Sequence, residues 1–275
     1  MFRFFIKKNF CDGWDNMFSI LLSNLLVISL LAGFAFLVWI AGFGFLARLA
    51  ASIKLLAMFA LIILAAGLLM AVVFAWGAIA RKIADFNTPS ISLFFRSLKE
   101  SWKTGFLFGL MLGVFVVFVA VALHYYLNMA FSGKSIGLFF VSLIVFFAFI
   151  TVMAMQWFVP LYFLQETNTF SKCFKKSFII FFDNAAFSFG MFLYNLFLFV
   201  FSFVLFFMLP GINGITLSNM NALRLRLYKY DWLEEHPDYE NDRDKRADVP
   251  WDELLADDKE SLGERKLLSF IFPWK

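Results

Sequence analysis

Residues 105–127, GFLFGLMLGVFVVFVAVALHYYL, decide the fold of this chain, because they form an apolar run without a single Asp, Glu, Lys or Arg. A helix needs about 20 such residues to cross a hydrocarbon core of about 30 Å. Four further uncharged apolar runs occur, at 18–40, 55–79, 138–164 and 185–209. The sequence therefore predicts an all-α, polytopic transmembrane helix bundle with five strong spans, in contact with the lipid bilayer.

Three glycines recur every fourth residue at the start of the quoted run: Gly105, Gly109 and Gly113. Glycines stacked on one helix face let a neighbouring backbone approach closely, which drives helix association in lipid. We expect this stripe to pack against another helix of the same chain. A seam between copies in a homo-oligomer is the alternative.

The composition indicates how the chain meets lipid. The chain is 62% hydrophobic and 16% charged, and it contains 42 Phe. Soluble domains are about 25% charged, and Phe inserts into membranes about as well as Leu. We interpret the Phe excess as lipid contact rather than as a cofactor site.

The net charge of +4 divides unevenly along the chain. Residues 1–223 carry 14 Lys/Arg and 6 Asp/Glu, whereas residues 224–275 carry 10 and 14. If the span flanks alternate between two sides, eleven Lys/Arg fall on the side of the N-terminus. Three fall on the other side: Arg48, Lys54 and Lys134. Because positively charged loops stay in the cytoplasm, we expect a cytoplasmic N-terminus. The basic charge then serves topology and not nucleic-acid binding.

The segment after the fifth span helps to decide on which side of the membrane the C-terminus lies. Arg224, Arg226 and Lys229 suit a cytoplasmic flank, but five spans would place them outside. Residues 212–228 are too polar to face lipid, yet as a helix they would rise about 25 Å. We expect a weak, protein-enclosed sixth helix over 212–228 and a cytoplasmic tail. The alternative is an interfacial helix with the tail outside.

The tail, residues 229–275, mixes acidic and basic residues densely as far as residue 266. Such a composition favours a solvated segment, so we expect an acidic and largely flexible tail. Its apolar end, residues 267–274, is expected to dock on the membrane or on a partner.

Two loops on the expected cytoplasmic side combine Lys/Arg with apolar residues at helical spacing. The first is FNTPSISLFFRSLKESWK, residues 86–103, and the second is TNTFSKCFKKSF, residues 167–178. Both are typical of amphipathic interfacial helices that lie on lipid headgroups. They are either charged linkers that hold topology or docking surfaces for a cytoplasmic partner. Their candidate partner or headgroup contacts are Arg96, Lys99, Lys172, Lys175 and Lys176.

Polar residues at membrane depth are candidates for function, and we single out Asn24, Gln156 and Asn195. Each of them can also serve only as a hydrogen bond between helices. Two cysteines, Cys11 and Cys173, indicate no disulfide framework. No phosphate-binding, zinc-hydrolase or serine-hydrolase motif occurs. We therefore expect no catalytic, metal or cofactor-binding residues and no enzymatic activity.

Two stretches carry a family resemblance: GAIARKIADFNTPSISLFFRSLKESWKTG at 77–105 and PLYFLQETNTFSKCFKKSFIIFFDNAAFSFG at 160–190. Together with Leu209-Pro210, they resemble the YesL-like family of small bacterial integral-membrane proteins, a domain of unknown function. The resemblance implies five or six helices in the bacterial inner membrane. It also implies an accessory role beside an ABC-type sugar transporter. The family supplies no catalytic residues to carry over.

Two functions therefore compete. The first is a non-enzymatic accessory to a carbohydrate-uptake or envelope complex, with the basic loops as contact surfaces. The alternative is a channel or facilitative transporter for a small solute. Its path would be lined by Asn24, Gln156, Asn195 and the polar segment Asn213–Asn221.

Overall fold

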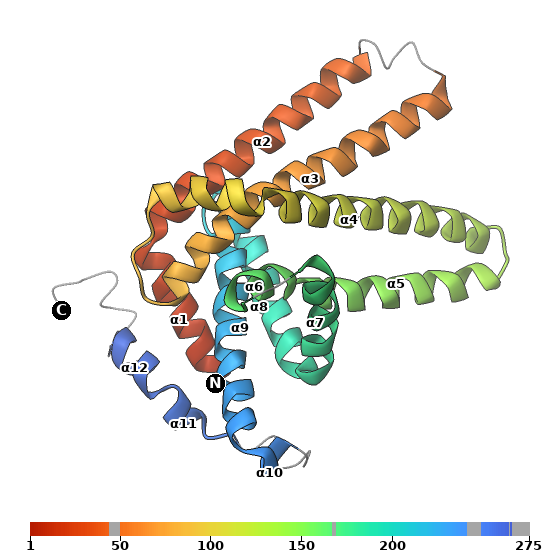
Figure 1. Cartoon of the computed structure of the whole chain (residues 1–275). Helices are drawn as coiled ribbons and strands as arrows, with labels where there is room; N and C mark the ends of the chain where they lie inside the picture. Colours follow the sequence, from red (N-terminus) through yellow and green to blue (C-terminus); the bar gives the residue numbers. More distant parts are fainter. Residues whose placement is uncertain (44–49, 167–168, 241–248, 264, 266–275) are drawn as a thin grey trace.

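A computed structural model describes residues 1–43, 50–166, 169–240, 249–263 and 265, and every regular element in these ranges is a helix. Five stretches of helix are long and apolar enough to cross a membrane, which confirms the predicted all-α polytopic class. The helices, shown in Figure 1, are α1 (Phe2–Asp15), α2 (Met17–Phe43), α3 (Ala51–Ala84), α4 (Ile91–Phe131), α5 (Ile136–Met155), α6 (Phe158–Leu164), α7 (Phe170–Asp183), α8 (Ala185–Val204), α9 (Gly211–Glu235), α10 (Pro237–Glu240), α11 (Trp251–Leu254) and α12 (Ala256–Leu262). Arg48, residues 167–168 and the apolar end at 267–274 lie outside the described residues.

Two long hairpins, α2–α3 and α4–α5, extend away from a base built by the remaining helices (Figure 1). The hairpins meet where α3 packs against α4, and the glycine stripe lies at this contact. A Cβ placed on Gly109 would lie 2.2 Å from the carbonyl oxygen of Ala66. Cβ atoms on Gly105 and Gly113 would each lie 2.9 Å from the α3 backbone. The three glycines therefore let α3 and α4 approach within one protomer.

Helix α9 runs through the base, in contact with α1, α2, α3, α6 and α8. It is longer than the expected 212–228, because it starts at Gly211 and continues to Glu235. Most residues from Gly211 to Leu225 are buried. This segment, which is too polar to face lipid, is therefore enclosed by protein.

Two of the predicted spans have different bounds. The run 138–164 is divided into α5 and α6 at Gln156 and Trp157. Pro160 explains the break, since its missing N–H cannot bond to the carbonyl of Gln156. The run 185–209 stops being helical at Val204, and Phe206 and Phe207 take positive φ angles of 50° and 59°. Left-handed residues cannot continue a right-handed helix.

The two basic loops differ from each other. Residues 91–103 are not a separate helix but the first turns of α4, whereas α7 is a separate helix that ends at Asp183. The apolar face of α7, formed by Phe170, Phe174 and Phe178, was expected to lie on headgroups. In the structure its residues are half-buried and pack against the core around Phe158. The exposed apolar residues of α7 are Ile179 and Phe182.

In its described residues, the tail is more ordered than the prediction of a largely flexible segment. Residues 229–235 belong to α9, and residues 249–262 form α11 and α12 over the base (Figure 1). Val249, Leu255 and Leu262 are buried. These few apolar residues, together with ion pairs to α1 and α9, hold a segment that its overall composition presents as solvated.

Candidate functional site

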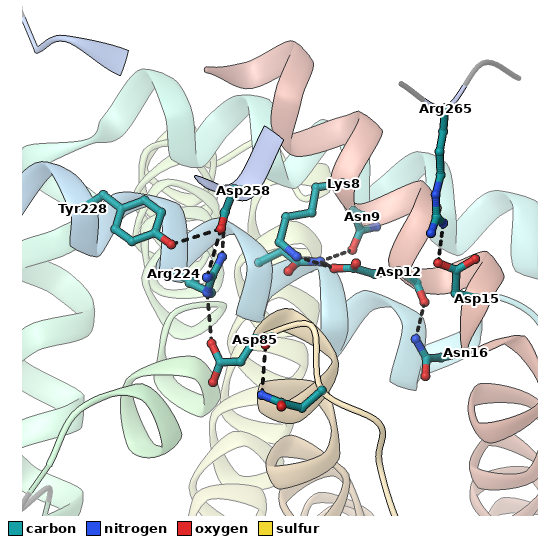
Figure 2. A network of polar contacts seen from close by, with 12 residues as sticks. Lys8, Asn9, Asp12, Asp15, Asn16, Asp85, Arg224, Tyr228, Asp258 and Arg265 are labelled. Carbon is teal, nitrogen blue, oxygen red and sulfur yellow. Dashed lines mark hydrogen bonds and ion pairs between the residues drawn. The ribbon is translucent and has the colours of Figure 1, made fainter. Parts of the chain in front are cut away.

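The tail is attached to the base through the guanidinium group of Arg224 on α9 (Figure 2). Its Nη1 and Nη2 donate to the two carboxylate oxygens of Asp258 on α12, at 2.6 and 3.1 Å. Its Nε donates to Asp85, just after α3, at 3.0 Å. Tyr228, one turn further along α9, donates its hydroxyl to Asp258 at 3.2 Å. A bidentate pair of this kind fixes orientation as well as position, so Arg224 joins three segments of the chain.

A buried ion pair lies beside this contact. Lys8 and Asp12 are one helical turn apart on α1, and Lys8 Nζ lies 2.9 Å from Asp12 Oδ2. The same oxygen accepts a 2.9 Å hydrogen bond from the Asn221 amide of α9. Lys8 Nζ also lies 3.6 Å from the centre of the Phe86 ring. Burial lowers the pKa of Lys8 and raises the pKa of Asp12, and in each case the partner's charge opposes the shift.

A second set of contacts joins the tail to α1. Arg265 forms an ion pair and hydrogen bond with Asp15, and Lys7 Nζ donates to the Gly263 carbonyl at 3.3 Å. We call the contacts of Arg224, Asp258, Lys8 and Asp12 the base network. What this network can do is hold α1, α3, α9 and the tail in one arrangement. Within the described residues, no three His, Cys, Asp or Glu side chains gather as a metal site.

A cavity of about 240 Å³ opens at the corner between α7 and α8. Its wall includes Arg226 and Lys229 of α9 and Trp251 of the tail. Asp183, also in the wall, accepts a 2.8 Å hydrogen bond from the Tyr230 hydroxyl and lies 3.6 Å from Lys229 Nζ. Burial, with Asp183 adding to it, raises the pKa of Tyr230. Arg226 stacks its guanidinium 4.0 Å from the Phe187 ring centre. The corner therefore balances two cations against one carboxylate.

The five basic candidate residues are dispersed. Arg96 and Lys99 are exposed near the start of α4, beside the exposed side chains of Ile91, Phe95 and Trp102. Lys172 and Lys175 are exposed on α7, whereas Lys176 donates to Gln165 at 2.7 Å. The start of α4 and α7 lie to either side of α9 in Figure 1. They are two separate surfaces and not one site.

The three polar candidates at depth each bond to α8, α9 or the turn between them. Asn24 donates to the carbonyls of Met208 and Pro210, at 3.0 and 2.7 Å, and accepts from the Asn213 N–H at 3.1 Å. Gln156 donates to the Ser188 carbonyl at 3.1 Å. Asn195 donates to Asn219 at 2.6 Å. These side chains therefore serve helix packing in the structure.

Several buried polar atoms of α9 have no hydrogen-bond partner in the described structure. They are both side-chain atoms of the Asn213 amide, the Ser218 hydroxyl and the Asn221 carbonyl oxygen, and the carbonyl oxygen of Asn195 on α8 shares this state. Buried polar groups are normally bonded to protein or to ordered water. The interior along α9 is thus more polar than the packing of the helix requires.

The base network was not predicted from the sequence. The Lys8–Asp12 spacing of four residues was the available signal, because such pairs lie on one helix face. Arg224 and Asp258 gave no local signal, since 34 positions separate them and Asp258 stands in an acidic run. No family model matches this chain, and neither the curated proteins nor the solved structures include a significant match.

Proposed function

We propose that this protein is a non-enzymatic membrane protein that assists a transport or envelope complex from the side of its termini. The observation that carries the proposal is the attachment of Asp258 to Arg224, which turns an acidic tail into part of a folded base. An accessory protein needs a fixed surface outside the bilayer.

The exposed start of α4 supports the same proposal. Arg96 and Lys99 stand beside Phe95 and Trp102, of which 63% and 46% remain exposed. Lys103 lies next to Trp102, with Nζ 5.9 Å from its ring centre. Aromatic and cationic side chains together suit lipid headgroups or the acidic surface of a partner. By resemblance alone, we take a carbohydrate-uptake system of the bacterial inner membrane as the complex.

The test is reconstitution with a partner complex of that class. An ABC-type sugar transporter is placed in vesicles with this protein, and sugar uptake and chemical cross-linking are measured. We expect Arg96→Glu with Lys99→Glu to reduce both, whereas Lys134→Glu, at the exposed far turn of α4–α5, should reduce neither. Equal cross-linking and uptake for all three forms would refute the proposal.

A solute channel or facilitative transporter is the second candidate, and one observation favours it. The buried amide of Asn213 has no partner, as expected for a side chain that faces water or a polar solute. Proteoliposome flux tests this candidate. It predicts permeation of a small polar solute that falls with Asn213→Leu and with Asn195→Leu. No flux of water or of small polyols would rule it out for these solutes.

A further inference from the structure

The first step concerns how far α9 reaches along the α2–α3 hairpin. A Cβ on Gly211 would lie 2.4 Å from the Asn24 amide nitrogen, and the Trp76 indole donates to the Asn213 carbonyl at 2.9 Å. Beyond Asn24, α2 continues to Phe43, which adds about 28 Å, and α3 begins at Ala51, about 37 Å before Trp76. The hairpin therefore extends beyond the start of α9 by about one hydrocarbon thickness, 30 Å.

The second step concerns the level of the membrane surface. Gly105 of α4 packs against Ala71 of α3, and the exposed Lys103 precedes it on α4. Of the charged residues of α3, Arg81 and Lys82 follow Trp76, whereas Lys54 lies in the first turn, at the far end of the helix. On both helices, the long uncharged stretch thus begins near the level of Trp76 and extends away from α9.

The third step concerns α8, which lies antiparallel to α9 along its whole length. The Asn184 amide donates to the Tyr230 hydroxyl near one end. Asn195 bonds to Asn219 at 2.6 Å in the middle, and the Gly211 N–H donates to the Ser202 hydroxyl at 2.9 Å near the other end. Because α8 ends where α9 starts, it ends at the level of Asn24. The length and apolar composition of α8 would allow a crossing. However, α8 stops at the level of Asn24 and does not run beside the part of α2 and α3 that extends beyond this level.

The fourth step concerns parity. The ion pair of Arg265 with Asp15 and the hydrogen bond of Lys7 to Gly263 place the tail beside α1. Both ends of the described chain therefore lie at one end of the molecule, which requires an even number of crossings. Four crossings by α2, α3, α4 and α5 meet this requirement. Five crossings do not. Six crossings, with α8 and α9 added, would also meet it, but the register of α8 described above excludes them.

We infer that only α2–α5 cross the membrane, and that α8 lies in the leaflet on the side of the termini with its Phe-rich face against the acyl chains. That face is exposed at helical spacing: Phe189, Leu193, Phe197, Val200 and Phe203, continued by Phe206 in the following turn. The opposite face, with Met191, Asn195 and Ser202, is buried. The exposed face is apolar throughout and suits contact with acyl chains, while the buried face packs on protein. The occupant of the surface is thus the lipid of a single leaflet.

The test is the side of the membrane on which the α8–α9 turn emerges. A hydrophilic Gly-Ser-Cys-Ser-Gly insertion is placed between Phe207 and Met208 of the full chain, in which Cys11 and Cys173 are replaced by Ala. The matched control carries the same insertion between Ser132 and Gly133 in the α4–α5 turn. Labelling with a membrane-impermeant maleimide is compared in intact cells and in inverted membrane vesicles.

We expect the two insertions to react from opposite faces. Maleimide added on the face from which the Ser132 insertion reacts should give only background labelling of the Phe207 insertion. Labelling of both from the same face would overturn the inference, because α8 would then cross. The substitution Phe206→Cys, which leaves the turn length unchanged, is the second variant: any reaction from the face of the Ser132 insertion overturns the inference, and its absence there supports it.

Discussion

Arg224 holds Asp258 through two parallel hydrogen bonds, of 2.6 and 3.1 Å, although 34 positions separate the two residues in the sequence. Only 16% of the Arg224 side chain and 5% of the Asp258 side chain are exposed, so water screens the pair weakly. Hydrogen bonds between charged groups in such surroundings contribute about 1.5–3 kcal/mol each to stability. The position of the tail therefore depends strongly on one pair.

The first prediction concerns this pair. Asp258→Asn should release residues 251–262 from the base and lower the free energy of local opening by about 2 kcal/mol, because Arg224 loses a charged acceptor. Hydrogen exchange of the backbone amides of α12 measures this opening. The matched control is Asp252→Asn, whose side chain is exposed and pairs with the partly exposed Lys259. It should change exchange little, and equal exchange in both variants would contradict the prediction.

The second prediction concerns Lys8 and Asp12. Lys8→Met leaves the Asp12 carboxylate buried without its cation, and removal of one partner of a buried pair costs about 3–5 kcal/mol. Adding Asp12→Asn removes that charge and keeps an oxygen for the Asn221 amide. The double variant should therefore be more stable than Lys8→Met alone in thermal unfolding in detergent. A double variant less stable than the single one would show that the pair is not coupled in this way.

The third prediction follows from the raised pKa of Asp12. The folded protein keeps the Asp12 proton at pH values where the unfolded chain, with the ordinary pKa of 3.8, has lost it. Stability attributable to Asp12 therefore falls as the pH rises from 3.8 through the raised pKa. Asp12→Asn should lack this fall, as measured by unfolding between pH 4 and 7. A wild-type curve parallel to that of Asp12→Asn would refute it.

Asp252 is a control whose pKa shift, and therefore pH dependence of stability, has the opposite sign. The hydrogen bond from Lys259 lowers the pKa of the Asp252 carboxyl. Its contribution is present above the ordinary pKa and is lost as the pH falls through the lowered value. The change should be small, because the side chain is fully exposed to solvent and screened.

The apolar runs predicted the helical class and the approximate positions of the long helices, because a membrane leaves few alternatives for an uncharged run of 20 residues. They could not predict the break at Gln156, which depends on a single Pro160. The spacing of Phe170, Phe174 and Phe178 predicted an apolar face on α7. It could not predict that this face packs against protein, because such a face can bury against protein as well as against lipid. Helical periodicity identifies an apolar face but not its partner.

The base network shows a second limit of the sequence. Counting charges places Asp85 and Arg224 beside predicted spans and Asp258 in the tail, and it gives no sign that they pair. Their pairing depends on α9 carrying Arg224 to the end of α3, which is a property of the tertiary arrangement. Asn24, in contrast, could be predicted as a polar candidate because an amide in an apolar run is unusual. Its partners in the turn before α9 could not be predicted.

The fourth prediction concerns the contact of α3 with α4. Gly109→Ala would place a methyl group 2.2 Å from the Ala66 carbonyl oxygen, and the helix backbones must separate to admit it. Overpacking of this kind costs about 1–3 kcal/mol, seen as a lower midpoint of thermal unfolding. Gly33→Ala on α2 is the control, because nothing lies within 4 Å of its added Cβ. It should be neutral or stabilising, and an equal loss in both would contradict the close contact.

The last prediction concerns Asn24, whose side-chain amide makes two hydrogen bonds to the turn between α8 and α9 and one to the first turn of α9. Asn24→Leu leaves the Met208 carbonyl and the Asn213 N–H without that partner, whereas the Pro210 carbonyl still accepts from the Gly214 N–H. Each buried unpaired group costs about 1–3 kcal/mol. The start of α9 should therefore open more often, which faster hydrogen exchange of residues 211–214 would reveal. Ser23→Ala is the control, since Ser23 bonds to the Ile20 carbonyl of its own helix. If Asn24→Leu leaves exchange unchanged but abolishes solute flux, Asn24 lines a path rather than fixing the turn, and the channel gains over the accessory role.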